Sequence, residues 1–191
     1  MERVPGQLGS VAQRDATHMI DIQERVMSLF IPDFDDTVVV RAADAELTGA
    51  GGPVTNQLLV DSPATGGALS SMRVTLGKGA NGARPHHHGK SAEMFYVLEG
   101  TAQLLSGAQV VTAERGDVVV VPPGTPHAFA AAPGEILDML VIITPGVERF
   151  EYFRHLERIR YGKLPPESLL EVQELYDSYF TTSALWDAAR A

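Results

Sequence analysis

The order of hydrophobic and polar residues predicts many short β-strands across the middle of the chain. Runs rich in Val, Ile, Thr and aromatic residues recur there, and Gly, Pro, Asn or Asp separates most of them. We expect strands at residues 37–41, 55–61, 68–76, 93–98, 103–105, 109–112, 118–121, 127–130 and 136–144. Gly100 is expected to end one of them, and the continuous apolar run at 118–121 predicts a strand covered on both faces. Such a series of strands is typical of an all-β sandwich or barrel.

The two ends of the chain follow other patterns. The first residues are weakly specified, with a short helix before Pro32 as one interpretation. After residue 146 a helical period predicts a helix near residues 150–159, and Pro166 can open a second helix at 167–179. We expect both helices to cover the outside of the barrel or a dimer interface, with Trp186 anchoring the tail. The predicted organisation is an N-terminal arm (1–36), a β-barrel domain (37–146) and a helical extension (147–191).

Composition narrows the class of function. The 191 residues carry a formal net charge of −9, which argues against nucleic acid and against an anionic membrane surface as partners. Hydrophobic residues make up 45%, enough for a sizeable core. Because there is no cysteine, disulfides and thiolate metal ligands are excluded. With no secretory pattern and no long apolar run, we expect a cytoplasmic protein.

Two short phrases in the strand-rich region contain four of the six histidines. In the first phrase, His86 and His88 lie two residues apart, so on a β-strand both point to one face while His87 points away. Residues 89–92 include Gly, Lys and Ser and can turn the chain, which returns Glu93 to the histidines. The phrase therefore predicts two imidazoles and one carboxylate in one place.

The second phrase supplies a third imidazole. Residues 122–126 read Pro-Pro-Gly-Thr-Pro and force a rigid bend, because each proline fixes φ and removes a donor, and His127 follows directly. Three imidazoles and one carboxylate suit a divalent first-row metal ion and leave a coordination position free for chemistry. The predicted metal ligands are His86, His88, Glu93 and His127. Iron, manganese, nickel, cobalt and zinc all accept such ligands, so the identity of the ion stays open.

A solvated histidine loop and an ordinary surface His127 are the alternatives to a metal site. We favour the metal site because every one of these histidines lies beside strand and turn signals, whereas His18 and His155 lack such neighbours and are expected at the surface. Glu93 has two candidate roles. It stays a ligand, or it acts as a general base that takes a proton from a substrate hydroxyl.

The side chains expected beside the metal are mostly apolar. Phe95 and Val97 share the strand parity of Glu93. Arg73 is a candidate for pairing a substrate carboxylate, but an outward salt bridge is favoured because charged groups are rarely buried. An apolar pocket with one charged metal suits an aromatic or polyketide-like substrate better than a sugar or a phosphate.

The two phrases resemble the two motifs of the cupin superfamily. The first motif matches in the spacing of His86, His88, Glu93 and Gly100, although its leading glycine is replaced by Ala80. The second matches at Gly116, Pro122, Gly124 and His127, with Ala131 where an asparagine often stands. The resemblance spans roughly residues 37–146. It implies a double-stranded β-helix (jelly-roll) barrel that holds the metal, here followed by a C-terminal pair of helices.

Within the cupins, the first motif and the phrase at 145–150 resemble bacterial single-domain quercetin (flavonol) dioxygenases. That resemblance implies that Glu93 deprotonates a hydroxylated aromatic compound, which then reacts with dioxygen. A metal-dependent polyketide cyclase or isomerase and a non-enzymatic small-molecule-binding cupin are the alternatives. The expected partners are a small aromatic or polyketide-like molecule and a second copy of the chain in a homodimer, without nucleic acid or membrane.

Overall fold

The computed structural model describes residues 34–191, so the helix predicted before Pro32 and nearly all of the predicted arm lie outside the described residues. The described strands are β1 (Glu46–Thr48), β2 (Val54–Val60), β3 (Ser70–Leu76), β4 (His86–His87), β5 (Ala92–Ser106), β6 (Gln109–Glu114), β7 (Val118–Val121), β8 (His127–Ala131), β9 (Leu137–Thr144) and β10 (Tyr179–Phe180). Two α-helices, α2 (Phe150–Arg160) and α3 (Ala184–Ala189), and two 3-10 helices, η1 (Ser62–Thr65) and η2 (Pro166–Val172), complete these elements.

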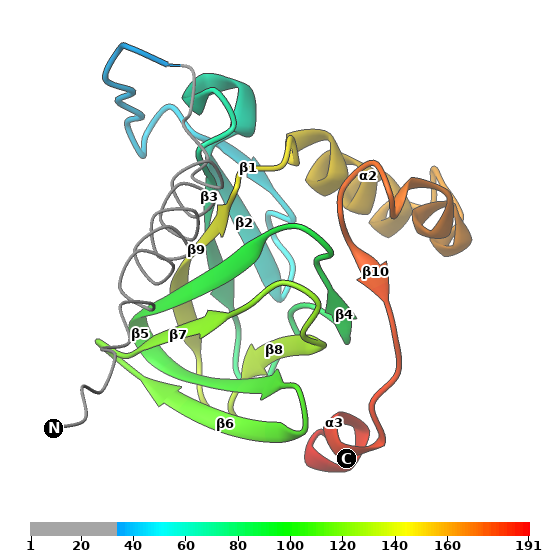
Figure 1. The fold of residues 1–191 in the computed structure, drawn as a ribbon. Helices are drawn as coiled ribbons and strands as arrows, with labels where there is room; N and C mark the ends of the chain where they lie inside the picture. Colours follow the sequence, from blue (N-terminus) through cyan, green and yellow to red (C-terminus); the bar gives the residue numbers. More distant parts are fainter. Residues whose placement is uncertain (1–33) are drawn as a thin grey trace, which may run out of the picture. The chain divides into compact units, whose positions relative to one another are not determined.

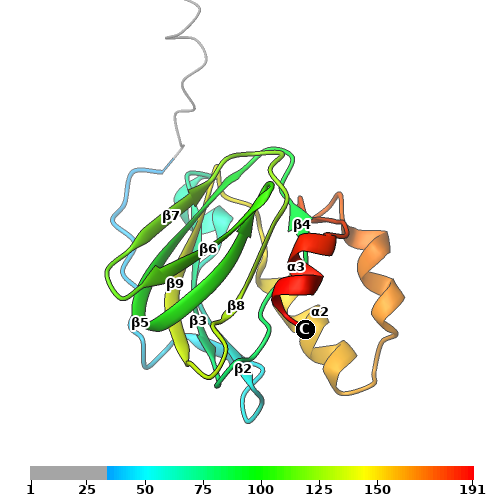
Figure 2. The same cartoon turned by 90° about the horizontal axis from the view of Figure 1, so that it is seen from below.

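The strands form the predicted all-β jelly-roll barrel (Figure 1). Every strand pair is antiparallel, in the order β1-β2-β3-β9-β5-β8-β4-β10, and β6 and β7 also pair with β5. Figure 2 shows α2 and α3 on the side of the barrel where β4 lies. This is the side on which the histidine phrases meet the C-terminal extension.

The long strand β5 joins the two halves of the barrel. Its first part pairs with β7 and β9, and its second part pairs with β6 and β8. Gly100 lies between the two parts with a φ of +77°, and the pairing with β9 slips by one residue just before it. The inward-facing residues therefore change from odd numbers (Phe95, Val97) to even numbers (Ala102, Leu104). The prediction of two strands separated by a turn at Gly100 is wrong, because the glycine bends one strand instead of ending it.

Side chains from both halves of the barrel fill its core. On β3, Met72 and Val74 point inward and are buried. Arg73 points outward, where its Nε donates to the Asp138 carboxylate at 2.8 Å. The outward salt bridge predicted for Arg73 is therefore present. The buried apolar residues of this core include Leu58, Leu76, Phe95, Val97, Leu104, Val121, Phe129, Leu137, Met139 and Val141.

The C-terminal extension forms two α-helices, but only one lies where the sequence predicts it. Helix α2 follows the helical period and buries Tyr152 and Phe153. The helix predicted at 167–179 is wrong: η2 ends at Val172, and the chain then turns so that β10 can pair with β4. The second α-helix is α3, whose Trp186 packs on Leu105 and two alanines of β8. The tail is thus anchored on the barrel of its own chain.

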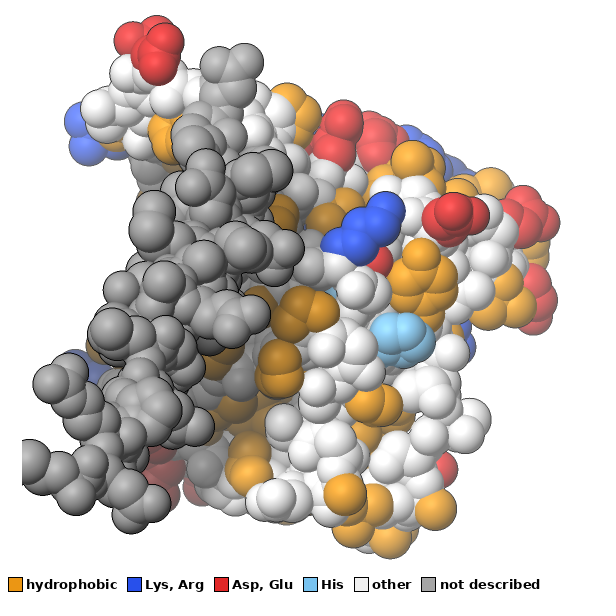
Figure 3. All heavy atoms as spheres, viewed as in Figure 1, with side chains coloured by type: hydrophobic (Ala, Val, Ile, Leu, Met, Phe, Trp, Pro, Cys, Tyr) orange, Lys and Arg blue, Asp and Glu red, His pale blue; other side chains and the backbone are white. Residues whose placement is uncertain are grey.

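Three further differences concern exposed segments. Residues 37–41 form no strand and are exposed, whereas β1 was not predicted. Strand β7 is not covered on both faces, because Val118 and Val120 are 54% and 60% exposed. Figure 3 shows hydrophobic side chains exposed over β5 and β7. Within residues 34–191, no helix is long and apolar enough to cross a lipid bilayer.

We expect Gly100→Ala to lower the free energy of unfolding strongly. A Cβ at this position would lie 2.0 Å from the backbone oxygen of Ile136, and the positive φ alone costs a non-glycine residue about 1–2 kcal/mol. Gly134→Ala is the matched control, since Gly134 has a φ of +78° and open space around the added Cβ. Urea unfolding of both variants would measure the difference. Equal destabilisation by the two substitutions would contradict a close-packed bend at Gly100.

Candidate metal centre

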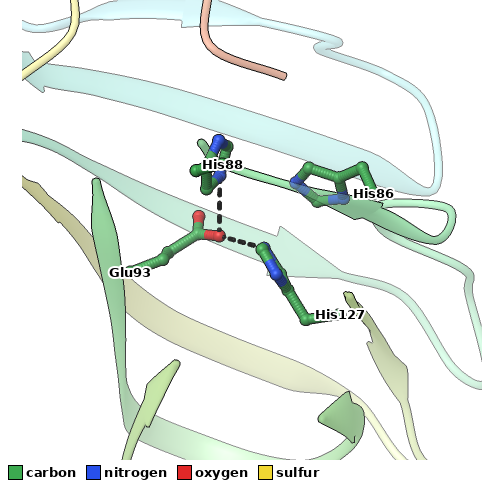
Figure 4. A group of neighbouring side chains, drawn as sticks. All are labelled: His86, His88, Glu93 and His127. Atoms are coloured by element: carbon green, nitrogen blue, oxygen red, sulfur yellow. Dashed lines mark hydrogen bonds and ion pairs between the residues drawn. The ribbon is translucent and has the colours of Figure 1, made fainter. Parts of the chain in front are cut away.

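The barrel brings all four predicted ligands together (Figure 4). His86 on β4 lies directly opposite His127 on β8, His88 follows β4, and Glu93 lies near the start of β5. One candidate ligand atom from each residue lies within 4.8 Å of the other three. The Glu93 Oε2 atom lies 2.6 Å from His127 Nε2 and 3.2 Å from His88 Nε2. Strand pairing has therefore joined Glu93 and His127, which lie 34 positions apart in the sequence.

The alternation expected along the first phrase is present. His86 and His88 are 5% and 2% exposed and share a ring-centroid distance of 5.0 Å. His87 is only half-buried and stacks on Tyr179 of β10 at 5.2 Å between ring centroids. The two neighbouring imidazoles thus point into the cluster, and the one between them points away from it.

Backbone carbonyls fix the orientation of all three rings. The Nδ1 atoms of His86 and His127 lie 2.9 Å from the carbonyl oxygens of Arg84 and Thr125, and Nδ1 of His88 contacts the carbonyl oxygen of Asp177. A carbonyl only accepts hydrogen bonds, so each Nδ1 carries the proton. The Nε2 lone pairs are left to point at the centre. This is the arrangement that metal-bound histidines commonly adopt.

Burial and mutual charge set the protonation of the cluster. Burial, followed by the charge on His127, lowers the pKa of His86 to about 3, which leaves a neutral imidazole at neutral pH. Burial acts to raise the pKa of Glu93, but its bonds to His127 and His88 outweigh burial and hold that pKa well below its usual value. For His127, burial is likewise outweighed by the Glu93 carboxylate, which raises its pKa. Without an ion, a proton between His127 and Glu93 balances the buried carboxylate.

The donor set fits a divalent transition metal. An ion about 2.1 Å from each nitrogen or oxygen places neighbouring ligand atoms roughly 3 Å apart and opposite ones about 4.2 Å apart. The measured separations of 2.6 Å and 3.2 Å, inside an overall limit of 4.8 Å, need only small adjustments to reach this geometry. Four protein ligands also leave coordination positions open on an ion that accepts five or six. The cluster could therefore hold one metal ion, and its donor atoms leave the element open.

A buried aspartate from the C-terminal extension holds the turn between His88 and Glu93. The carboxylate of Asp177 accepts hydrogen bonds from the backbone N–H groups of Gly89, Lys90 and Ser91 at 2.8, 3.0 and 3.3 Å. Among residues 34–191, Asp177 is the one non-glycine residue with a positive φ, at 47°. A short polar side chain tolerates this conformation better than most. Asp177 therefore secures both the His88 ring, through its carbonyl, and the turn, through its carboxylate.

A cavity of about 340 Å³ reaches the cluster. His86 and Glu93 line its inner end, and Phe129 contributes an aromatic wall. The remaining walls come from the barrel strands and from the extension: Val54, Asn56, Met72, Gly82, Ala83, Arg84, Arg149, Tyr152, Phe153, Leu156, Leu169 and Phe180. Helix α2 and η2 therefore form part of the cavity. Helix α2 packs on the barrel, which is one of the two predicted positions, and in addition it lines the cavity, which was not predicted.

Arg149 and Asp177 are the site residues that the sequence analysis did not identify. Arg149 is 5% exposed, and its Nη1 lies 3.4 Å from Nε2 of His88. One sequence signal could have suggested Arg149. It directly precedes a predicted helix, where a positive charge is unfavourable because of the helix dipole, so its presence there indicates a role other than helix stabilisation. Asp177 carries no such signal, because it lies inside a segment whose pattern predicts a continuous helix.

Comparison with known proteins identifies the fold. Residues 72–143 match the family model described as a cupin domain. An RmlC-like cupin from Shewanella frigidimarina is 20% identical with a TM-score of 0.50, over 61% of this chain and 96% of that one. Two further structures match. A predicted oxalate decarboxylase from Thermotoga maritima is 22% identical with a TM-score of 0.49, over 56% of this chain and 98% of that one. The polyketide cyclase RemF from Streptomyces resistomycificus is 21% identical with a TM-score of 0.48, over 68% of this chain and 95% of that one.

Proteins of curated function give no significant match to this chain. The RmlC-like cupin is less than 25% identical to this chain, so its likeness supports the fold and not a reaction. Both motifs of the cupin resemblance, from His86 to Gly100 and from Gly116 to His127, lie inside the matched residues. Residues 72–143 therefore match a cupin domain, and the described strands form the jelly-roll fold that such a domain has.

Proposed function

We propose that this cupin is a metal-dependent dioxygenase that acts on a flavonol-like or other polyphenolic compound. One divalent transition metal would be held by His86, His88, Glu93 and His127. The observation that carries the proposal is the cavity of about 340 Å³, which reaches two of these residues and is otherwise mostly apolar and aromatic. Small-molecule sites are typically concave and apolar with a few polar groups placed at one end.

The walls of the cavity favour a flat substrate over a sugar. Phe129 approaches from the barrel, and Tyr152, Phe153 and Phe180 approach from the C-terminal extension. Aromatic rings stack on or pack edge-to-face against such side chains. Apart from the candidate metal ligands and two arginines, the polar groups among the lining residues are the Asn56 amide and the Tyr152 hydroxyl, so few hydrogen bonds are available to the hydroxyl groups of a sugar ring.

Glu93 has the position needed for proton transfer. Its carboxylate lines the cavity, so a substrate hydroxyl group bound there lies beside a group that can accept its proton. When bound, the metal lowers the pKa of a coordinated hydroxyl and promotes reaction of the resulting anion with dioxygen. Both oxygen atoms enter the organic product, so the substrate is the only reductant. The apolar walls orient the substrate ring and keep bulk water away from the anion.

Elemental analysis tests the metal site directly. We expect the purified protein to retain close to one transition-metal ion per chain, and His86→Ala/His127→Ala to retain almost none, since two of four ligands are removed. His155→Ala is the control, because that imidazole bonds to Ser168 away from the cluster. Stoichiometric metal in the double variant would rule out the assigned ligands.

Asp177→Ala should weaken metal binding without removing a ligand side chain. Loss of its three hydrogen bonds frees the turn between His88 and Glu93, and loss of groups that orient ligands typically lowers metal affinity about 10–100-fold. Competition with a fluorescent chelator would measure the change. Glu174→Ala, an exposed residue three positions earlier in the same segment, should bind metal like the wild type. An unchanged affinity in Asp177→Ala would show that the turn holds its shape unaided.

Oxygen uptake by metal-loaded protein, measured with a panel of flavonols and other polyphenols, tests the reaction. A dioxygenase should consume one O2 per molecule of product. Turnover that continues without oxygen would replace the proposal with a cyclase or isomerase, and tight binding without any product would replace it with a binding protein.

Glu93→Gln identifies the role of the carboxylate in that assay. Glutamine keeps the shape and one ligand oxygen but cannot accept a proton, so activity per bound metal should fall about 10²–10⁴-fold. Metal content is measured on the same samples, so that reduced loading is not mistaken for lost catalysis. Activity per metal equal to the wild-type value would leave Glu93 as a ligand alone.

A further inference from the structure

Arg149 places a buried cation beside the metal cluster. Its backbone N–H and that of Phe150 donate to the Asp61 carboxylate at 2.8 and 3.2 Å, which fixes the start of α2. The side chain then lines the cavity, with its guanidinium carbon 5.0 Å from the Tyr152 ring centroid and 5.7 Å from that of Phe153. The position of this cation is therefore set by both its backbone and its aromatic neighbours.

The guanidinium has no anionic partner among residues 34–191. Its Nη1 lies 3.4 Å from Nε2 of His88, and its Nε is buried without any hydrogen-bond partner. A buried, unpaired cation is unfavourable, because desolvation is not compensated. A metal bound to His88 would occupy the Nε2 lone pair and remove the one acceptor that Arg149 contacts. The loaded site would then present two neighbouring cations, the metal ion and Arg149, with Glu93 as the one acid among the lining residues.

The charge of the cavity contrasts with that of the whole chain. The formal net charge of the protein is −9, yet the cavity is lined by Arg84 and Arg149 and by one acid, Glu93. Arg84 stacks over Phe180, with 3.7 Å between its guanidinium carbon and the ring centroid. A divalent ion would add two further positive charges at the inner end. The cavity is thus electropositive inside an acidic protein, which attracts anionic ligands.

We propose that Arg149 binds an anionic oxygen of the substrate, so that the site selects flat aromatic or polyketide-like compounds carrying a carboxylate or an acidic hydroxyl group. The guanidinium is always charged and presents planar donors that suit such oxygens. The aromatic walls contact the apolar body of the ligand. This inference rests on the proposed function for the presence of the metal, but the contact with Arg149 itself does not require it.

Three naphthalene compounds test the inference by calorimetry. 2-Naphthoate carries a carboxylate, 2-naphthamide is its neutral counterpart, and 2,3-dihydroxynaphthalene carries acidic hydroxyl groups without a carboxylate. Metal-loaded wild-type protein should bind 2-naphthoate at least about 10-fold more tightly than the amide, as expected for a charge-assisted hydrogen bond. Arg149→Met should abolish this preference and leave the affinity for the amide unchanged within about twofold. Arg149→Lys should retain part of it.

The dihydroxy compound distinguishes the two sources of the anion. If Arg149→Met weakens both 2-naphthoate and 2,3-dihydroxynaphthalene, Arg149 binds any anionic oxygen. If it weakens 2-naphthoate alone, the substrate carries a carboxylate. Arg154→Met is the matched control, because Arg154 lies on the same helix and pairs with Glu46 and Glu151 outside the cavity. That control should bind all three compounds like the wild type.

Measurements on metal-free protein distinguish this inference from the proposed function. The difference between wild type and Arg149→Met for 2-naphthoate should persist without metal, even if the protein proves not to be an oxygenase. A preference for 2-naphthoate that survives in metal-loaded Arg149→Met would assign anion binding to the metal alone and overturn the inference. Equal losses of affinity for 2-naphthoate and 2-naphthamide in Arg149→Met would show a purely structural role. If the wild type binds neither 2-naphthoate nor 2,3-dihydroxynaphthalene at millimolar concentration, the proposed substrate class is overturned.

Discussion

A buried carboxylate imposes the arrangement of the whole site. Glu93 is 2% exposed, and an ionised carboxylate in an apolar interior is strongly unfavourable unless it is compensated. Its Oε2 atom lies 2.6 Å from Nε2 of His127 and 3.2 Å from Nε2 of His88, so the compensation has to come from a cation shared with these imidazoles. A proton can balance the charge, as the raised pKa of His127 indicates, but a divalent ion satisfies all four groups at once. The rest of the structure keeps these groups in place.

The C-terminal extension is part of the site and not an addition to the barrel. Two aspartates connect the extension and the barrel through backbone hydrogen bonds. Asp61, just before η1, caps the start of α2 and so positions Arg149. Asp177 reaches from the extension to the turn between His88 and Glu93. In the first contact a barrel residue holds the extension, and in the second an extension residue holds the barrel. A jelly-roll barrel without this extension would lack the aromatic wall, the buried arginine and the support for that turn.

The chemical selectivity that we propose depends on the place where the barrel and the extension meet. The barrel supplies the candidate metal ligands and Phe129, which are compatible with many reactions of the cupin fold. The extension supplies Tyr152, Phe153 and Arg149, which in our proposal contact the flat body and the negative end of the ligand. The proposed substrate class therefore depends on residues outside the two motifs. A likeness in fold alone, such as that to the RmlC-like cupin at 20% identity, therefore does not transfer a reaction.

The amino-acid sequence by itself determined the barrel and the four candidate ligands, because both follow from short-range patterns. Alternation places His86 and His88 on one face, and a proline-rich bend precedes His127. Patterns of this range fail in two places. At Gly100, one bent strand was predicted as two strands, because the glycine bends the backbone. Beyond Val172, the chain pairs with β4 instead of forming the expected helix. Arg149 and Asp177 reach His88 from 61 and 89 positions away. Only the tertiary structure decided these contacts, since no local pattern specifies which distant side chain meets a buried histidine.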